Sequence, residues 1–184
     1  MNILVFSASL RKDSFNTKLA ALAAEAARQG GDSTVELIRL NDYDMPAFSS
    51  DTDAAGKPEA VERFKKLLDA HPALIIASPE YNYSMPGHLK NLIDWISRYR
   101  PMPWSRKAIL LMSASTSAMA GVRGLWQLRQ PFEGCGAFVF PDMLTVAQAQ
   151  SAFGPDGRLA DARQMQRLQD VVKSFVAFVG GLKY

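Results

Sequence analysis

The strongest constraint on the fold is a series of short apolar runs separated by segments with helical periodicity. Asn2–Ala8, Ala73–Ala77 and Lys107–Ser113 are short and almost continuously apolar. Such runs suit strands that are buried on both faces, as in a parallel sheet covered by helices. Between them, apolar residues recur every three or four positions, for example at Leu89 and Leu92. This alternation predicts an α/β fold built on a parallel sheet.

The expected elements follow one another regularly along the chain. Strands are expected at Asn2–Ala8, Thr34–Leu40, Ala73–Ala77, Lys107–Ser113 and Ala137–Phe140. Helices are expected at Asn16–Arg28, from Pro58 onward, after Pro86-Gly87, at Val122–Phe132 and from about Asp161 to Val179, where Gly180-Gly181 ends the last one. The polar segment Asn41–Lys57 is expected to be a loop. Five strand–helix units predict a doubly wound, flavodoxin-like, five-stranded parallel sheet in the order 2-1-3-4-5.

Length, composition and charge limit the class of protein. With 184 residues, 48% hydrophobic and 21% charged, the chain suits one globular domain over residues 1–184. It has no apolar run of the roughly 18 residues that a membrane span needs, and no basic leader, so we expect a cytoplasmic location. Cys135 is the only cysteine, and only His71 and His88 could join it as soft ligands, so no metal site is expected. The net charge of +3 is scattered, which favours small anionic ligands over nucleic acid.

The loop after the first expected strand has the residues of an anion site. Ser9, Ser14, Asn16 and Thr17 offer side-chain donors, and Arg11 adds a full charge just before a helix begins. A helix N-terminus contributes unpaired N–H groups and the positive end of its dipole. The simpler interpretation is a helix cap at Ser14 or Asn16, which leaves Ser9 and Arg11 unexplained. The glycine patterns of nucleoside-triphosphate and dinucleotide loops are absent.

The loop after the third expected strand is rich in aromatic and hydrogen-bonding groups. It runs from Pro79 through Glu80, Tyr81, Asn82 and Tyr83 to Ser84. In the order 2-1-3-4-5 this loop faces the first loop across the switch point of the sheet, where ligands bind in open α/β sheets. A surface turn with incidental tyrosines is the alternative interpretation. Together, the two loops predict a ligand site at one edge of the sheet.

The two loops resemble those of a known family. They are similar to the corresponding loops of the NADPH-dependent FMN reductase family, in particular its quinone, chromate and azo-dye reductase branch. The matching patterns are S-x-L-R-K-x-S-F-N after the first strand and P-E-Y-N-x-S-x-P-G-x-L-K-N-x-I-D-W after the third. Members usually carry glycine where this chain has Ala8, and a more glycine-rich third loop. The resemblance covers Ser7–Asn16 and Pro79–Trp95 closely.

The resemblance implies a set of cofactor-binding residues. FMN would be held without a covalent link, its phosphate at Ser9, Arg11, Ser14, Phe15, Asn16 and Thr17. The isoalloxazine ring would lie beside Pro79, Glu80, Tyr81 and Asn82, with backbone groups of Tyr81 and Asn82 as its hydrogen-bonding partners. A third loop would map to Ser113, Ala114 and Ser115, with Ser113 and Ser115 as its binding residues. Glu80 has three open roles, since it can touch the cofactor, brace the loop or meet a neighbouring subunit.

The resemblance also implies an activity. Electrons would pass from NADPH or NADH through FMN to a small acceptor such as a quinone, azo compound, chromate or free flavin, with no side chain assigned as catalytic because the flavin carries the chemistry. The alternative is a flavodoxin-type electron carrier, although such carriers usually have acidic surfaces and this chain is net positive. A supplier of free reduced FMN is a third possibility.

A homodimer or homotetramer is expected from the helix after Pro86. Its apolar positions are more numerous than one sheet face needs, and the family resemblance points the same way. These positions are Leu89, Leu92, Ile93, Trp95 and Ile96.

Overall fold

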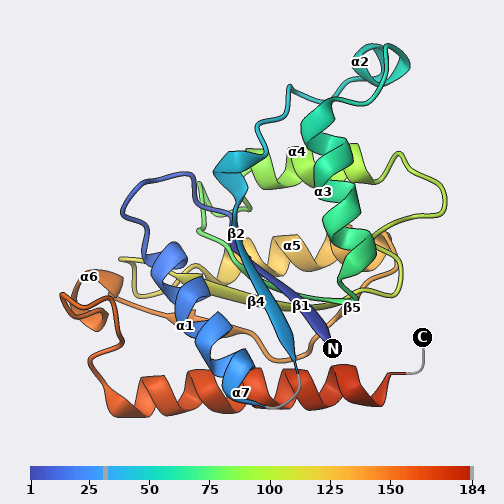
Figure 1. The fold of residues 1–184 in the computed structure, drawn as a ribbon. Helices are drawn as coiled ribbons and strands as arrows, with labels where there is room; N and C mark the ends of the chain where they lie inside the picture. The colour runs from blue at the N-terminus through green and yellow to red at the C-terminus, as the bar shows by residue number, and fades with distance from the viewer. Residues whose placement is uncertain (31–32, 183–184) are drawn as a thin grey trace.

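A parallel sheet with helices on both faces forms the centre of the computed structural model, which describes residues 1–30 and 33–182 (Figure 1). Its strands are β1 (Asn2–Ser7), β2 (Thr34–Arg39), β3 (Ala73–Ala77), β4 (Ala108–Ala114), β5 (Phe138–Val139) and β6 (Leu144–Val146). The order is β2-β1-β3-β4-β5, every pair is parallel, and β6 also pairs with β4. The predicted flavodoxin-like order is confirmed.

The edge of the sheet beside β4 differs from the prediction. A single strand was expected at Ala137–Phe140, but β5 has only two residues, and β6 pairs with the far end of the same β4. Pro141 follows Phe140 and has no N–H to donate, so it interrupts the ladder. The fifth position of the sheet is therefore shared by two short strands.

The helices match the predicted positions and add short elements between them. They are α1 (Phe15–Gln29), α2 (Ser50–Ala54), α3 (Glu59–Ala70), α4 (Gly87–Ile96), α5 (Val122–Gly134), α6 (Ala149–Ala152), α7 (Ala162–Gly181) and the 3-10 helix η1 (Leu40–Asp42). The expected loop Asn41–Lys57 contains α2, which begins with a capping box formed by Ser49 and Thr52. Gly180-Gly181 does not end the last helix at Val179, since α7 runs through Gly181. No helix in the described part of the chain has the length and apolarity to cross a membrane.

The helices cover the sheet in two layers. In Figure 1, α1 and α7 lie on one face, while α3, α4 and α5 lie on the other. Alternate residues of β1 serve the two layers, so Ile3 and Val5 join the α1 and α7 side and Leu4 and Phe6 join the opposite side. This arrangement explains why the central strands are apolar at nearly every position.

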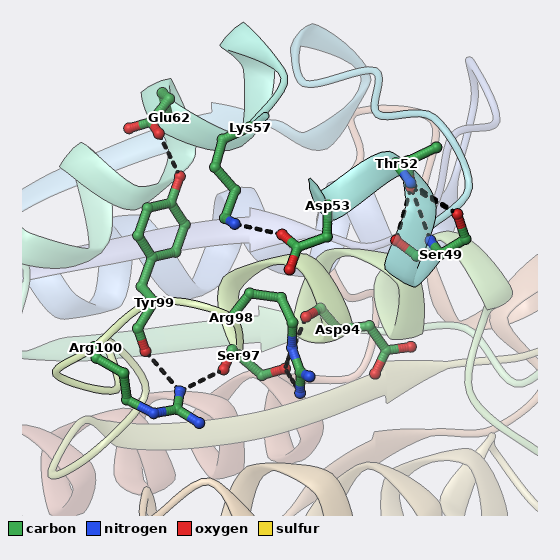
Figure 2. A network of polar contacts seen from close by, with 10 residues as sticks. All are labelled: Ser49, Thr52, Asp53, Lys57, Glu62, Asp94, Ser97, Arg98, Tyr99 and Arg100. Atoms are coloured by element: carbon green, nitrogen blue, oxygen red, sulfur yellow. Dashed lines mark hydrogen bonds and ion pairs between the residues drawn. The ribbon is translucent and has the colours of Figure 1, made fainter. Parts of the chain in front are cut away.

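The segment between η1 and α3 is anchored to α4. Phe48 N–H donates to Asn91 Oδ1 at 2.8 Å, and Trp95 Nε1 donates to the Pro46 carbonyl at 2.8 Å. Figure 2 shows polar contacts farther along, where Lys57 pairs with Asp53, and where the Tyr99 hydroxyl donates to Glu62. The segment before α2 is therefore tied to the body of the molecule at Pro46 and Phe48.

The chain itself covers the apolar face of α4. This face was predicted to be wider than the sheet requires and to form a subunit interface. Its residues are instead packed against the sheet and against the segment before α3, so the width of the face gives no support for an interface at α4. The five residues, Leu89, Leu92, Ile93, Trp95 and Ile96, are each at most 2% exposed.

Asn91→Ala tests whether hydrogen bonds anchor the segment before α3. The change removes the acceptor for Phe48 N–H and the donor to Pro46 O, which lies 3.0 Å from Asn91 Nδ2. We expect the free energy of unfolding in urea to fall by about 1–2 kcal/mol. Lys90→Ala, which breaks only an exposed pair with Asp94, should cost less than about 0.5 kcal/mol. Equal losses for the two variants would contradict the anchoring role.

Candidate functional site

Three loops meet at the carboxyl ends of β1, β3 and β4, where they enclose a cavity of about 220 Å³. Ligands of open α/β sheets bind at this edge. The cavity brings together most of the site residues predicted from the sequence. They are Ser9, Arg11, Ser14, Phe15, Asn16, Pro79, Tyr81 and Ser115, joined by Ala114 of the expected third loop and by Thr116, which was not predicted.

The first loop is shaped by its own serines. Ser9 N–H donates to Ser7 Oγ at 3.1 Å, and Ser14 is the N-cap of α1, accepting from Asn16 N–H at 3.1 Å. The cap proposed for Ser14 is therefore present, and its hydroxyl also lines the cavity. The Arg11 guanidinium donates to the Asp13 carbonyl at 2.7 Å and lies 5.5 Å from the centre of the Phe15 ring. The loop thus places the Arg11 cation in the cavity lining at the start of α1.

Asn16 has a structural role that the sequence did not reveal. Its Nδ2 donates to the Ala114 carbonyl at 2.8 Å, and its Oδ1 accepts from the Ala114 N–H at 2.9 Å. Asn16 is 3% exposed, and its side chain satisfies both backbone groups of a residue at the end of β4. Asn16 therefore fixes the first loop to the third. Its place among phosphate ligands stays a prediction.

The second loop makes a tight turn. Tyr81 N–H donates to Ser84 O at 2.9 Å, and Ser84 N–H donates back to Tyr81 O at 3.0 Å. The two residues between them, Asn82 and Tyr83, have φ values of 48° and 68°, as in the type I′ turns of hairpins. The N–H and C=O of Tyr81 both take part in the hydrogen bonds of the turn. Tyr81 and Asn82 were the two predicted backbone partners of the ring, and the N–H of Asn82 takes no part in those bonds.

Glu80 braces the second loop against α5. Its side chain is 8% exposed, and one carboxylate oxygen lies 2.6 Å from the Arg123 guanidinium. The other oxygen accepts from the N–H groups of Arg123 at 3.1 Å and Gly124 at 3.2 Å, which have no partner within the helix because they lie in its first turn. Of the three roles left open by the sequence, the structure thus shows the bracing role. The Glu80 side chain is not among those that line the cavity.

The third loop places Ser113 beneath the site. Ser113 is completely buried, and it lies where a side chain on Gly121 would be, since a Cβ at Gly121 would come 2.1 Å from Ser113 Oγ. Gly121 is the N-cap of α5 and has a φ of 80°. Glycine suits this position because it adopts positive φ values and because it has no Cβ to collide with Ser113. Ser115 and Thr116 line the cavity in its place, and Thr17 faces a neighbouring groove. Thr116 could have been found as the next polar residue of the loop.

The lining of the cavity fits a phosphate group. Its polar side chains are hydroxyls, one amide and the Arg11 guanidinium, and it includes no carboxylate. Hydroxyls, an arginine and a helix N-terminus are the donors that bind phosphate in proteins. The described residues contain no cluster of three or more potential metal ligands. The site is therefore suited to an anionic organic ligand.

Histidine and cysteine occupy structural positions. The His88 ring is hydrogen-bonded to the Ala8 carbonyl, and His71 Nδ1 lies 2.7 Å from the Leu67 carbonyl. Burial raises the pKa of the Cys135 thiol, and the thiol is half-buried against the core beneath α3, α4 and α5. A raised pKa leaves fewer thiolates at neutral pH, so Cys135 suits a packed thiol rather than a nucleophile.

Comparison with known proteins places the chain among flavin-dependent reductases. A model of the NADPH-dependent FMN reductase family matches residues 1–151. The chain belongs to this family. An NAD(P)H-dependent FMN reductase of Pseudomonas aeruginosa is 34% identical to it, over 100% of this chain and 97% of that protein. A quinone reductase of Pseudomonas putida is 33% identical, over 97% of this chain and 94% of the relative.

A solved structure agrees with these relatives. The flavoenzyme NAD(P)H:(acceptor) oxidoreductase FerB of Paracoccus denitrificans is similar with a TM-score of 0.80 and 29% identity, over 97% of each chain. The family membership inferred from the loops is confirmed, and with it an NAD(P)H-dependent reductase that uses FMN. The donor set of the cavity is compatible with the phosphate of FMN.

Asn16→Ala tests the link between the first and third loops. The variant leaves the buried N–H and C=O of Ala114 without their side-chain partner. We expect a loss of about 2–3 kcal/mol in the free energy of unfolding, measured by urea denaturation. Thr17→Ala, at the exposed neighbouring position, should change the value by less than about 0.5 kcal/mol. A similar effect of both changes would argue against the link.

Proposed function

We propose that this protein reduces quinones with electrons from NAD(P)H, and that its FMN phosphate lies in the cavity between the three loops. The carboxylate-free lining around Arg11, at the start of α1, is the observation that carries the proposal. The predicted set Ser9, Arg11, Ser14, Phe15, Asn16, Thr17, Pro79, Glu80, Tyr81, Asn82, Ser113 and Ser115 would divide into residues that touch the cofactor and residues that hold the loops. Asn16 and Glu80 fit the second group, since their side chains join one loop to another element, whereas Thr17 and Ser113 lie outside the cavity lining.

The size of the cavity supports an exposed ring. At about 220 Å³ it is smaller than the roughly 300–1,000 Å³ of pockets that enclose drug-sized ligands. It therefore suits the ribityl phosphate, with the flavin ring beyond it near Pro79 and the 45%-exposed Tyr81. An exposed ring can meet a nicotinamide and then a planar acceptor in turn.

The roles of the protein groups follow from this placement. Bound FMN supplies a ring that takes a hydride from a reduced nicotinamide and passes electrons to an acceptor. Ser9, Ser14 and Arg11 would neutralise and orient the phosphate. The turn at Asn82 would present its N–H to the ring edge, and the Glu80–Arg123 pair would keep that turn in place. Rigid loops of this kind lower the cost of orienting the reacting groups.

Quinones are the proposed acceptor because the relatives that cover nearly the whole chain include quinone reductases, such as that of Pseudomonas putida. Steady-state oxidation of NADPH and NADH by the purified, FMN-loaded protein with a soluble benzoquinone tests this. The proposal predicts turnover that depends on the quinone concentration. An electron carrier would bind FMN and show no such turnover, and a supplier of free reduced FMN would lose its flavin on gel filtration.

An exposed aromatic patch supports self-association. Tyr83 is 70% exposed, Trp126 is 52% exposed and Met119 is 46% exposed, although large apolar side chains are usually buried. The second loop and α5 adjoin here, since the Arg123 guanidinium lies 4.2 Å from the centre of the Tyr83 ring. We place the homodimer or homotetramer interface at this patch rather than at α4.

The unpaired, half-buried Cys135 is compatible with a cytoplasmic location.

Light scattering tests the patch. We expect a dimer or tetramer mass at micromolar concentration for the unaltered protein, and a monomer mass for the Trp126→Asp variant, because a charge would be buried at the interface. Leu37→Asp, at a 42%-exposed apolar position on β2, is the control and should keep the oligomer. A monomer mass for the unaltered protein would contradict the assignment.

Arg11→Ala tests the phosphate assignment. The change removes the one cation of the cavity lining, and we expect FMN affinity to fall by about 1.5 kcal/mol, or roughly tenfold, because Arg11 is exposed to solvent. Fluorescence titration of the apoprotein with FMN gives the affinity. Lys18→Ala is the matched control, since Lys18 also lies 5.5 Å from the Phe15 ring but does not line the cavity. Unchanged affinity for Arg11→Ala would mean that the phosphate lies elsewhere.

A further inference from the structure

A second, larger groove lies on the other side of the first loop, between α1 and the edge strand β2. Its volume is about 630 Å³. The small side chains of Ala20 and Ala21 leave space between the helix and the strand, and Leu37 and Ile38 supply an apolar wall. Leu37 is 42% exposed, which is unusual for a leucine on a strand. The groove can therefore receive a flat apolar group.

Three cations stand around this groove. Arg11, Lys12 and Arg39 line it, against the single carboxylate of Asp13. Within residues 1–30 and 33–182, the charged groups of Lys12 and Arg39 have neither an ion-pair nor a hydrogen-bond partner. Glu36, on the same strand, is directed to His71 at 3.3 Å instead. The rim of the groove is thus positively charged, and the charged groups of Lys12 and Arg39 are free to bind an anion.

Other arginines that could bind an anion near the flavin cavity are already engaged. Arg123 pairs with Glu80, and Arg129 pairs with Glu133 and donates to the Phe140 carbonyl. Arg98 donates to Ser97 and lies over the Phe48 ring. Among the cations that line the groove, Lys12 and Arg39 are the two whose charged groups are free to bind a phosphate.

The groove shares lining residues with two neighbouring cavities, one of which is the proposed FMN cavity. Ser9 and Arg11 line both this groove and the proposed FMN cavity. Leu40 and Asn41 line both this groove and a cavity of about 270 Å³ that reaches His88, whose ring centroid lies 6.5 Å from that of Tyr81. A ligand can extend from the Tyr81 side of the site over Asn41 and into the groove.

We propose that the groove between α1 and β2 binds the adenosine 2′-phosphate half of NADPH. The adenine lies against Leu37, Ala20 and Ala21, and the 2′-phosphate is bound by Lys12 and Arg39. Arginine and lysine are the side chains that bind phosphate most effectively, and NADH lacks the group that they recognise. The inference rests on the proposed function, because it names the residues that select the electron donor for the same flavin.

The Lys12→Gln, Arg39→Gln double variant tests this assignment in two ways. With FMN-loaded protein, benzoquinone and low ionic strength, we expect the KM for NADPH to rise about tenfold or more, while the KM for NADH stays within about twofold. Calorimetric titration of the FMN-loaded protein with adenosine 2′,5′-bisphosphate should show binding to the unaltered protein and at least about tenfold weaker binding to the double variant. Lys173→Gln, an exposed charge change on α7, is the control and should change neither value.

Four results would overturn the inference. Two concern the kinetics of the double variant: an unchanged KM for NADPH, or equal increases in the KM values for NADPH and NADH. Two concern the titrations: bisphosphate binding that the variant retains, or inorganic phosphate that binds as tightly as the bisphosphate, which would make the groove a plain anion site. If the unaltered protein oxidises neither NADPH nor NADH with the quinone, the proposed function fails, while the bisphosphate titration still decides the binding site.

Discussion

The pair of hydrogen bonds between Asn16 and the backbone of Ala114 is the constraint on which the site depends. The two residues are 98 positions apart, and their contact holds the N-terminus of α1 against the carboxyl end of β4. It holds the donors at the start of α1 beside the lining residues Ser115 and Thr116. One buried amide thus links the start of a helix to the end of a strand and defines a wall of the cavity.

The second wall depends on a different kind of contact. Glu80 accepts hydrogen bonds from the first N–H groups of α5 and from the Arg123 side chain, so the loop after β3 is held by a helix that begins after β4. Gly121 allows this approach because a side chain there would collide with Ser113. The loops nearest the proposed flavin are therefore braced from below.

Much of this arrangement could be predicted from the sequence. The fully apolar run Ala73–Ala77 indicated a strand covered on both faces, and the polar residues after β1 and β3 indicated where the site would lie. Local patterns could not reveal contacts between distant residues, so Asn16 was predicted as a ligand of phosphate and its bond to Ala114 was missed. The same limit applies to Glu80, whose partner Arg123 lies 43 positions away. The short apolar run Ala137–Phe140 predicted a single strand at the edge of the sheet. The division of this edge into β5 and β6 was missed because the interruption of the strand at Pro141 was not considered.

Hydrogen–deuterium exchange of the apoprotein with and without FMN tests the central claim most directly, because it reports which backbone segments the cofactor covers whatever the oligomeric state. The account predicts slower exchange on FMN addition in peptides that span Ser9–Thr17, Pro79–Tyr83 and Ser113–Thr116. Peptides that contain Leu144–Val146 and Gln164–Arg167, which line a separate groove, should exchange as before. Protection confined to that groove, or absent from the peptide containing Arg11, would contradict the account.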